Sequence, residues 1–137
     1  MAGADKPDFA HSASQGALLI VLAVAGFAGA AGVALAAVAA HRVTSPALAS
    51  AATMLMIHAG VAVAILAHAS RYANAGLWIA TSALMLAATA LFSGDIAANT
   101  LAEFHLFPYA APIGGSVLLA SWVLLAIVAL ASALSRR

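Results

Sequence analysis

The chain has 137 residues, of which 66% are hydrophobic and only 7% are charged, and its formal net charge is +1. A composition this apolar excludes a water-soluble domain, because the surface of such a domain could not be kept from aggregating. The absence of cysteine excludes disulfides, thiolate nucleophiles and cysteine-ligated metal centres, and the small net charge gives no case for nucleic-acid binding.

Four long apolar runs predict an all-α membrane protein with four transmembrane helices in an up-down antiparallel bundle. The runs cover residues 15–40, 47–69, 76–98 and 114–133. Each is near or above the roughly 20 residues that a helix needs to cross about 30 Å of hydrocarbon. A single transmembrane domain of residues 15–137 therefore follows a polar tail of residues 1–14.

The first run also has the form of a secretory signal, because its apolar core is followed by Ala28-Gly29-Ala30. The apolar residues continue to Ala40, so we expect a retained transmembrane span. Gly26, Gly29 and Gly32 lie within it, and small residues let helices approach closely in lipid. They predict helix packing within the chain, with homo-oligomerisation as the alternative.

The segments between the apolar runs contain residues that are typical of helix ends. Ser45 can cap the next helix and Pro46 suits a first helical position, which predicts a tight first turn. After the second run, Tyr72 and Trp78 lie where interfacial aromatic residues are common. The longest connection, residues 99–113, is apolar and aromatic, so we expect it in the membrane interface, with Pro112 and the following glycines starting the fourth helix.

The basic residues predict that both termini face the cytoplasm. Four spans place the two tails and the second connection on one side of the membrane. That side carries Lys6, Arg71, Arg136 and Arg137, whereas the opposite side carries only Arg42. Lys and Arg are more frequent in cytoplasmic loops, and this distribution gives the orientation.

The same topology places a group of five polar residues on the outer side of the membrane. Its members are His41, Arg42, Asp95, Glu103 and His105. A carboxylate in the last turn of the third span is costly unless it is paired or reaches water, and Arg42 is the natural partner of Asp95. We expect this ion pair, with a histidine nearby; proton transfer or ligand binding is the alternative role of the cluster.

His58 falls near the bilayer centre, about 16 Å along the second span. A neutral imidazole hydrogen-bonded to a hydroxyl or a carbonyl is the expected state, and a proton relay or cofactor ligand is the alternative. The plausible partners form a hydroxyl stripe on the third span: Ser82, Thr89 and Ser93.

No cofactor and no metal are predicted. Haem ligation by two histidines needs both rings at one depth on facing helices, whereas His58 and His68 are about 15 Å apart along one helix. Haem would therefore require a partner subunit or an oligomer. His41, His105, Asp95 and Glu103 are acceptable metal ligands but have no compact spacing motif.

Several segments together resemble domain-of-unknown-function family 423. They are GVALAAVAAH at 32–41, MLMIHA at 54–59, LFSGD at 91–95 and APIGG at 111–115, with Trp122. The family comprises uncharacterised four-helix proteins of the bacterial inner membrane and is related to a small mitochondrial-type protein of animals. The resemblance covers about residues 16–133. Alanines replace part of the family's Gly-Ala-x-Gly-Ala-His pattern, whose histidine remains as His41.

The resemblance implies a fold and a location without an established activity. The family-motif and candidate functional residues are His41, Arg42, His58, Ser93, Gly94, Asp95, Pro112, Gly114 and Gly115. With so few buried polar groups, we expect a non-enzymatic accessory or assembly subunit of a membrane complex, or a homo-oligomer, in the bacterial inner membrane. A small transporter or proton conductor using His58 and the Asp95/Arg42 cluster is the alternative, and a redox or lipid-modifying enzyme is a third.

Overall fold

Four antiparallel helices make up the fold. The computed structural model describes residues 9–69, 71 and 75–135, with side chains from residue 14 onward. Its helices are α1 (Phe9–His41), α2 (Pro46–Ala69), α3 (Ala75–Ala102) and α4 (Ala110–Leu134). Each contains a stretch long and apolar enough to cross a membrane, which in α1 is Ser14–His41. The predicted fold class is confirmed, and the chain is a multi-pass membrane protein.

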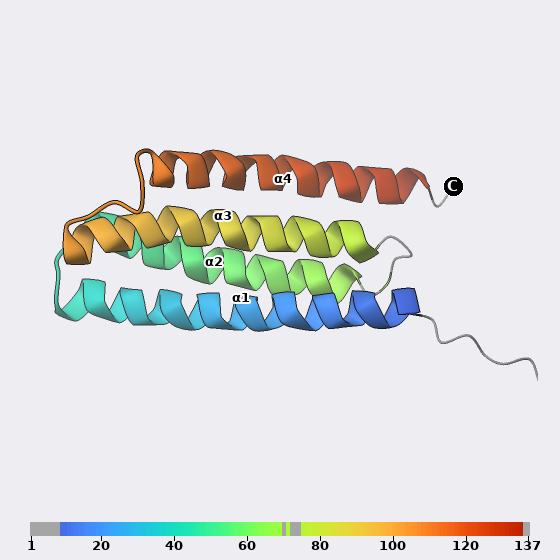
Figure 1. Cartoon of the computed structure of the whole chain (residues 1–137), viewed down its shortest axis with the longest axis horizontal. Coiled ribbons are helices and arrows are strands. Elements are labelled where there is room, and N and C mark those ends of the chain that lie inside the picture. The colour runs from blue at the N-terminus through green and yellow to red at the C-terminus, as the bar shows by residue number, and fades with distance from the viewer. Residues whose placement is uncertain (1–8, 70, 72–74, 136–137) are drawn as a thin grey trace, which may run out of the picture.

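The connections alternate between the two ends of the bundle (Figure 1). The α1–α2 and α3–α4 connections share one end, while α1 begins and α4 finishes at the other. The carboxyl ends of α1 and α3 are therefore neighbours, as the predicted group of five polar residues requires. Lys6, Tyr72, Arg136 and Arg137 lie outside the described residues.

Several helices extend beyond the apolar runs that predicted them. α1 takes in residues 9–14 of the expected polar tail, α3 continues to Ala102, and α4 begins at Ala110. The predicted connection of residues 99–113 shrinks to residues 103–109. An apolar run marks the hydrocarbon crossing, whereas backbone hydrogen bonds continue the helix into the polar layer.

The first turn has the predicted chemistry. Pro46 is the first residue of α2, and the Leu48 backbone N–H donates to the Ser45 hydroxyl oxygen at 3.2 Å. Ser45 thereby satisfies an amide that has no partner within the helix. The N-cap prediction is confirmed.

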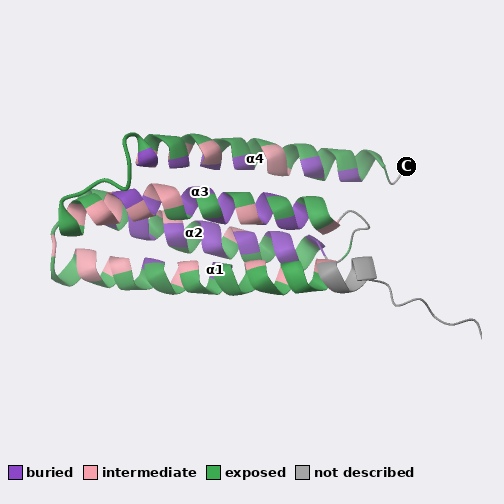
Figure 2. Ribbon diagram, in the orientation of Figure 1, coloured by how far each residue is buried: buried purple, intermediate pink, exposed green. Residues whose placement is uncertain are grey.

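The middle of the structure consists of α2 and α3, with α1 and α4 on opposite flanks. α1 packs on α2 and on α3, and α4 packs closely on α3 and reaches α2 through the bond from Trp122 to His58. Buried positions concentrate on α2 and α3 (Figure 2). Trp78, in the first turn of α3, belongs to this core: it is 4% exposed, and the centre of its ring lies 5.0 Å from that of His68.

Two glycines make the closest helix contacts. A Cβ on Gly32 would lie 2.7 Å from Met56 Cγ, and one on Gly114 would lie 2.6 Å from the Phe92 backbone nitrogen. Gly26 has nothing within 4 Å. The predicted packing role of the α1 glycines is therefore confirmed at Gly32 and is wrong for Gly26.

Hydroxyl groups also join the central helices. Ser82 Oγ donates to the Ala62 carbonyl at 3.3 Å, and Ser93 Oγ donates to the Ala51 carbonyl at 3.0 Å. Both bonds run from α3 to the backbone of α2. Ser82 and Ser93 thus hold helices together, as polar side chains in membrane bundles commonly do, whereas Thr89 Oγ1 donates to the Met85 carbonyl of its own helix at 2.8 Å.

Candidate functional site

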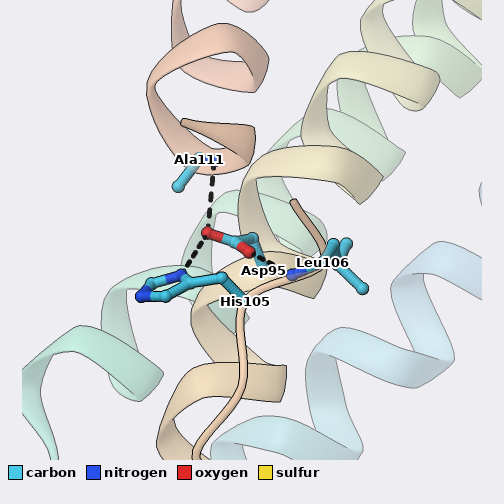
Figure 3. Close-up of polar contacts among 4 residues, drawn as sticks. All are labelled: Asp95, His105, Leu106 and Ala111. Carbon is cyan, nitrogen blue, oxygen red and sulfur yellow. Dashed lines mark hydrogen bonds and ion pairs between the residues drawn. The ribbon is translucent and has the colours of Figure 1, made fainter. Parts of the chain in front are cut away.

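Asp95 is a buried carboxylate surrounded by hydrogen-bond donors (Figure 3). It is 2% exposed on α3. The Leu106 N–H donates to Oδ1 at 2.8 Å, the Ala111 N–H donates to Oδ2 at 3.3 Å, and His105 Nδ1 lies 3.1 Å from Oδ2. Backbone N–H groups only donate, so this arrangement suits the ionised carboxylate.

The connection between α3 and α4 provides Leu106 and His105, and the first turn of α4 provides Ala111. Glu103, at the start of the connection, has φ 56°, and Tyr109, at its end, has φ 67°. Both are in the left-handed region, which non-glycine residues rarely adopt. These two sharp bends return the chain over the last turns of α3 and bring the loop against Asp95.

Asp95 also supplies the cap that α4 lacks locally. Tyr109, the N-cap residue of α4, makes no side-chain capping bond. Ala111 follows within the first turn, where amides have no helical partner, and an anion is favoured at this positive end of the helix. The carboxylate from α3 takes that place. Pro112, which was expected to start α4, lies in the same first turn, where its missing N–H costs nothing.

The predicted ion pair between Asp95 and Arg42 is wrong. Arg42 is exposed at the end of α1, and the ion pair formed by Asp95 within the described residues is with His105. Two backbone amides and His105 already contact the carboxylate, so it does not depend on Arg42. The expectation of a neighbouring histidine is confirmed for His105, while His41 and Glu103 are exposed apart from this contact.

A cavity of about 420 Å³ adjoins the carboxylate. Its lining comes from α3, the loop and the first turn of α4: Asp95, His105, Phe107, Pro108, Tyr109, Ala111 and Pro112. One buried charge therefore borders a space otherwise walled by aromatic rings and prolines.

His58 lies in a second polar contact, halfway along α2. Its Nδ1 is 2.8 Å from the Met54 carbonyl oxygen, and Trp122 Nε1 donates to its Nε2 at 3.3 Å. The carbonyl can only accept and the indole can only donate, so these two contacts suit a ring that carries its hydrogen on Nδ1. The predicted bond to a carbonyl is confirmed, but Trp122 of α4 takes the place expected for a hydroxyl of α3.

A groove surrounds this contact. It has a volume of about 280 Å³ and is lined from α2, α3 and α4 by Met54, His58, Phe92, Gly115, Leu118, Leu119 and Trp122. Because the backbone of α4 packs closely on α3, α2 and α4 form the walls of the groove and Phe92 of α3 lies at its floor.

The candidate residues from the sequence divide among these regions. Asp95 and Pro112 line the cavity, and His58 and Gly115 line the groove. Gly114 and Ser93 hold helices together, and a Cβ on Gly94 would lie 3.8 Å from Leu106 Cδ1 of the loop. His41 and Arg42 line neither space.

The comparisons with known proteins returned one match. The family model described as "Protein of unknown function (DUF423)" matches residues 25–115, which is more than half of the chain. No curated protein and no solved structure matches.

Proposed function

Because the chain belongs to the family of proteins of unknown function DUF423, we propose its function from its own geometry. It is a non-enzymatic subunit that binds a transmembrane helix of a partner protein, or of a second copy, in the bacterial inner membrane. The observation that carries the proposal is the groove between α2 and α4, whose floor is α3.

The shape and composition of the groove support this function. Helix association in lipid depends on close packing and on hydrogen bonds, because lipid tails are as apolar as leucine. Gly115 leaves space on the α4 side, and Leu119 at the rim is 69% exposed. A further helix laid along this groove would bury surface that otherwise meets acyl chains.

Site-specific crosslinking tests the proposal, because the natural chain has no cysteine. Leu119→Cys should crosslink in native membranes to one discrete protein or to a second copy. Leu19→Cys, on the flank of α1 and 62% exposed, is the matched control and should give no such product. A protein that purifies in mild detergent as a monomer without partners, and that crosslinks equally from both positions, would contradict the proposal.

The alternative function, a transporter or proton conductor, remains a prediction that substitution of His58 can test. A proton relay needs a ring nitrogen free to take up and release protons, whereas both nitrogens of His58 are engaged. We expect His58→Ala to leave proton flux into proteoliposomes unchanged, measured with an internal pH-sensitive dye. A flux in the natural protein that disappears in the variant would favour the transporter.

We further expect both termini to face the cytoplasm. The charge distribution supports this orientation, since Arg42 is the only basic residue of the α1–α2 side. Topology reporters fused after residue 137 and inserted within residues 42–46 should report opposite compartments, with the carboxyl-terminal fusion cytoplasmic. The reverse pattern would place the Asp95 cavity on the cytoplasmic face instead.

A further inference from the structure

The carboxylate of Asp95 has no permanent cation beside it in the described part of the chain. Two of its three neighbours, the Leu106 and Ala111 amides, are neutral. The third is His105, whose ring is charged only when it is protonated. With His105 neutral, the buried carboxylate keeps a negative charge that hydrogen bonds stabilise but do not neutralise.

His105 is also the neighbour that can leave. Its side chain is 61% exposed, against 3% for that of Asp95. The other two donors belong to the backbone of the loop and of α4, and they cannot withdraw without unfolding that end of the bundle. A rotation of the His105 side chain alone would free one coordination position on Oδ2.

The adjoining cavity has the walls that an organic cation prefers. Phe107 and Tyr109 contribute aromatic rings, and Pro108 and Pro112 contribute apolar surface. The face of an aromatic ring attracts an ammonium group, and the attraction increases where water is excluded. Its volume of about 420 Å³ leaves room for an organic ammonium group.

We propose that this cavity binds an ammonium group, which replaces the His105 imidazole at Asp95 Oδ2. The group is either the amine of a lipid headgroup or a soluble amine, since both present the same chemistry. The cavity lies at the end of the bundle, where α3 finishes and α4 begins, which is the depth of headgroups rather than of acyl chains. This site is separate from the groove and does not depend on the proposed partner helix.

A metal ion fits the cavity less well. Within the described residues, no three His, Cys, Asp or Glu side chains gather closely enough to hold one. A hard divalent cation takes six or more oxygen ligands or keeps several waters, and here two neutral amides already occupy carboxylate positions.

Lipid retention tests the lipid source of the ammonium. The protein is reconstituted into nanodiscs of equal phosphatidylethanolamine and phosphatidylglycerol, and native mass spectrometry counts the lipids that stay bound. The natural protein should retain phosphatidylethanolamine in preference, and His105→Ala should increase that preference several-fold because the competing ring is gone. His41→Ala, which removes an exposed histidine at the same end, should leave it unchanged.

Two further variants remove the recognition chemistry. Asp95→Asn takes away the charge, and Phe107→Ala removes a ring that is 44% exposed and therefore not needed for the core. Both should abolish the lipid preference, and Phe107→Ala tests the site even where Asp95→Asn fails to fold. A preference that survives in either folded variant would overturn the proposal.

Free ethanolamine distinguishes the two sources. The test uses nanodiscs of phosphatidylglycerol alone. If a soluble amine is sufficient to fill the site, added ethanolamine should raise the thermal unfolding midpoint of His105→Ala but not that of Phe107→Ala. Phosphatidylethanolamine retention without an ethanolamine effect would assign the site to the lipid headgroup. If neither probe distinguishes His105→Ala from Phe107→Ala, no ammonium site exists.

Discussion

Replacing Asp95 by alanine is expected to destabilise the protein by about 1–3 kcal/mol, the cost of a buried donor left without an acceptor. The Leu106 and Ala111 amides would lose their common acceptor, and α4 would lose its cap. We expect the loss as a lower midpoint when SDS is titrated into the protein in mild-detergent micelles, followed by tryptophan fluorescence.

Arg42→Ala is the matched control for the same end of the bundle. Its side chain is exposed and takes no part in the Asp95 contacts, so the midpoint should change little. Asp95→Ala is therefore expected to lose more stability than Arg42→Ala. An ion pair between the two residues would imply the opposite, because removal of Arg42 would leave an uncompensated carboxylate. A larger loss for Arg42→Ala than for Asp95→Ala would restore that pair.

Gly114→Ala should produce a second large loss, of about 1–3 kcal/mol, as for other overpacked sites. The new Cβ would lie 2.6 Å from the Phe92 nitrogen and 3.0 Å from the Ala88 carbonyl oxygen. Both are backbone atoms of α3 and cannot rotate away, so α4 must move outward. The same SDS titration should show the loss. The fluorescence emission of Trp122 should also change, because an outward movement of α4 would lengthen the bond from Trp122 to His58 of α2.

Two other glycines provide the controls for Gly114→Ala. Gly60 has nothing within 4 Å of a built Cβ, and Gly115 approaches only the Phe92 ring, at 3.6 Å. Alanine at either position should leave the midpoint unchanged or slightly higher, because alanine favours helix over glycine. Equal midpoints for Gly114→Ala and Gly60→Ala would mean that α4 is not held closely against α3.

The fold could be predicted because its signals are local. A run of apolar residues specifies a membrane span whatever its neighbours are, and the Ser45 and Pro46 chemistry acts on the amides of its own turn. Helix ends were less predictable. Helices continue beyond the residues of high hydropathy. The start of α4 at Ala110, for example, lies four residues before the apolar run that predicted it.

The partners at the candidate sites depend on that missed start. His58 and Trp122 each lie 12 residues after the first residue of their helix, and α2 and α4 run in the same direction. The bond between their side chains places them at one depth, whereas a helix start at residue 114 leaves Trp122 nearer to the start of its helix than His58 is. The backbone donors to Asp95 could not be predicted for another reason. Every residue except proline has a backbone amide, so a search for a basic side chain as the partner of Asp95 does not find them.

The remote cap of α4 has a consequence for the order of synthesis. Asp95 enters the membrane with α3, whereas Leu106 and Ala111, which satisfy it, are translated later. Until they arrive, α1 to α3 can already pack on one another, but the Asp95 carboxylate lacks its backbone N–H donors. Arrival of the first turn of α4 removes that cost, so docking of the last helix completes the insertion of the third.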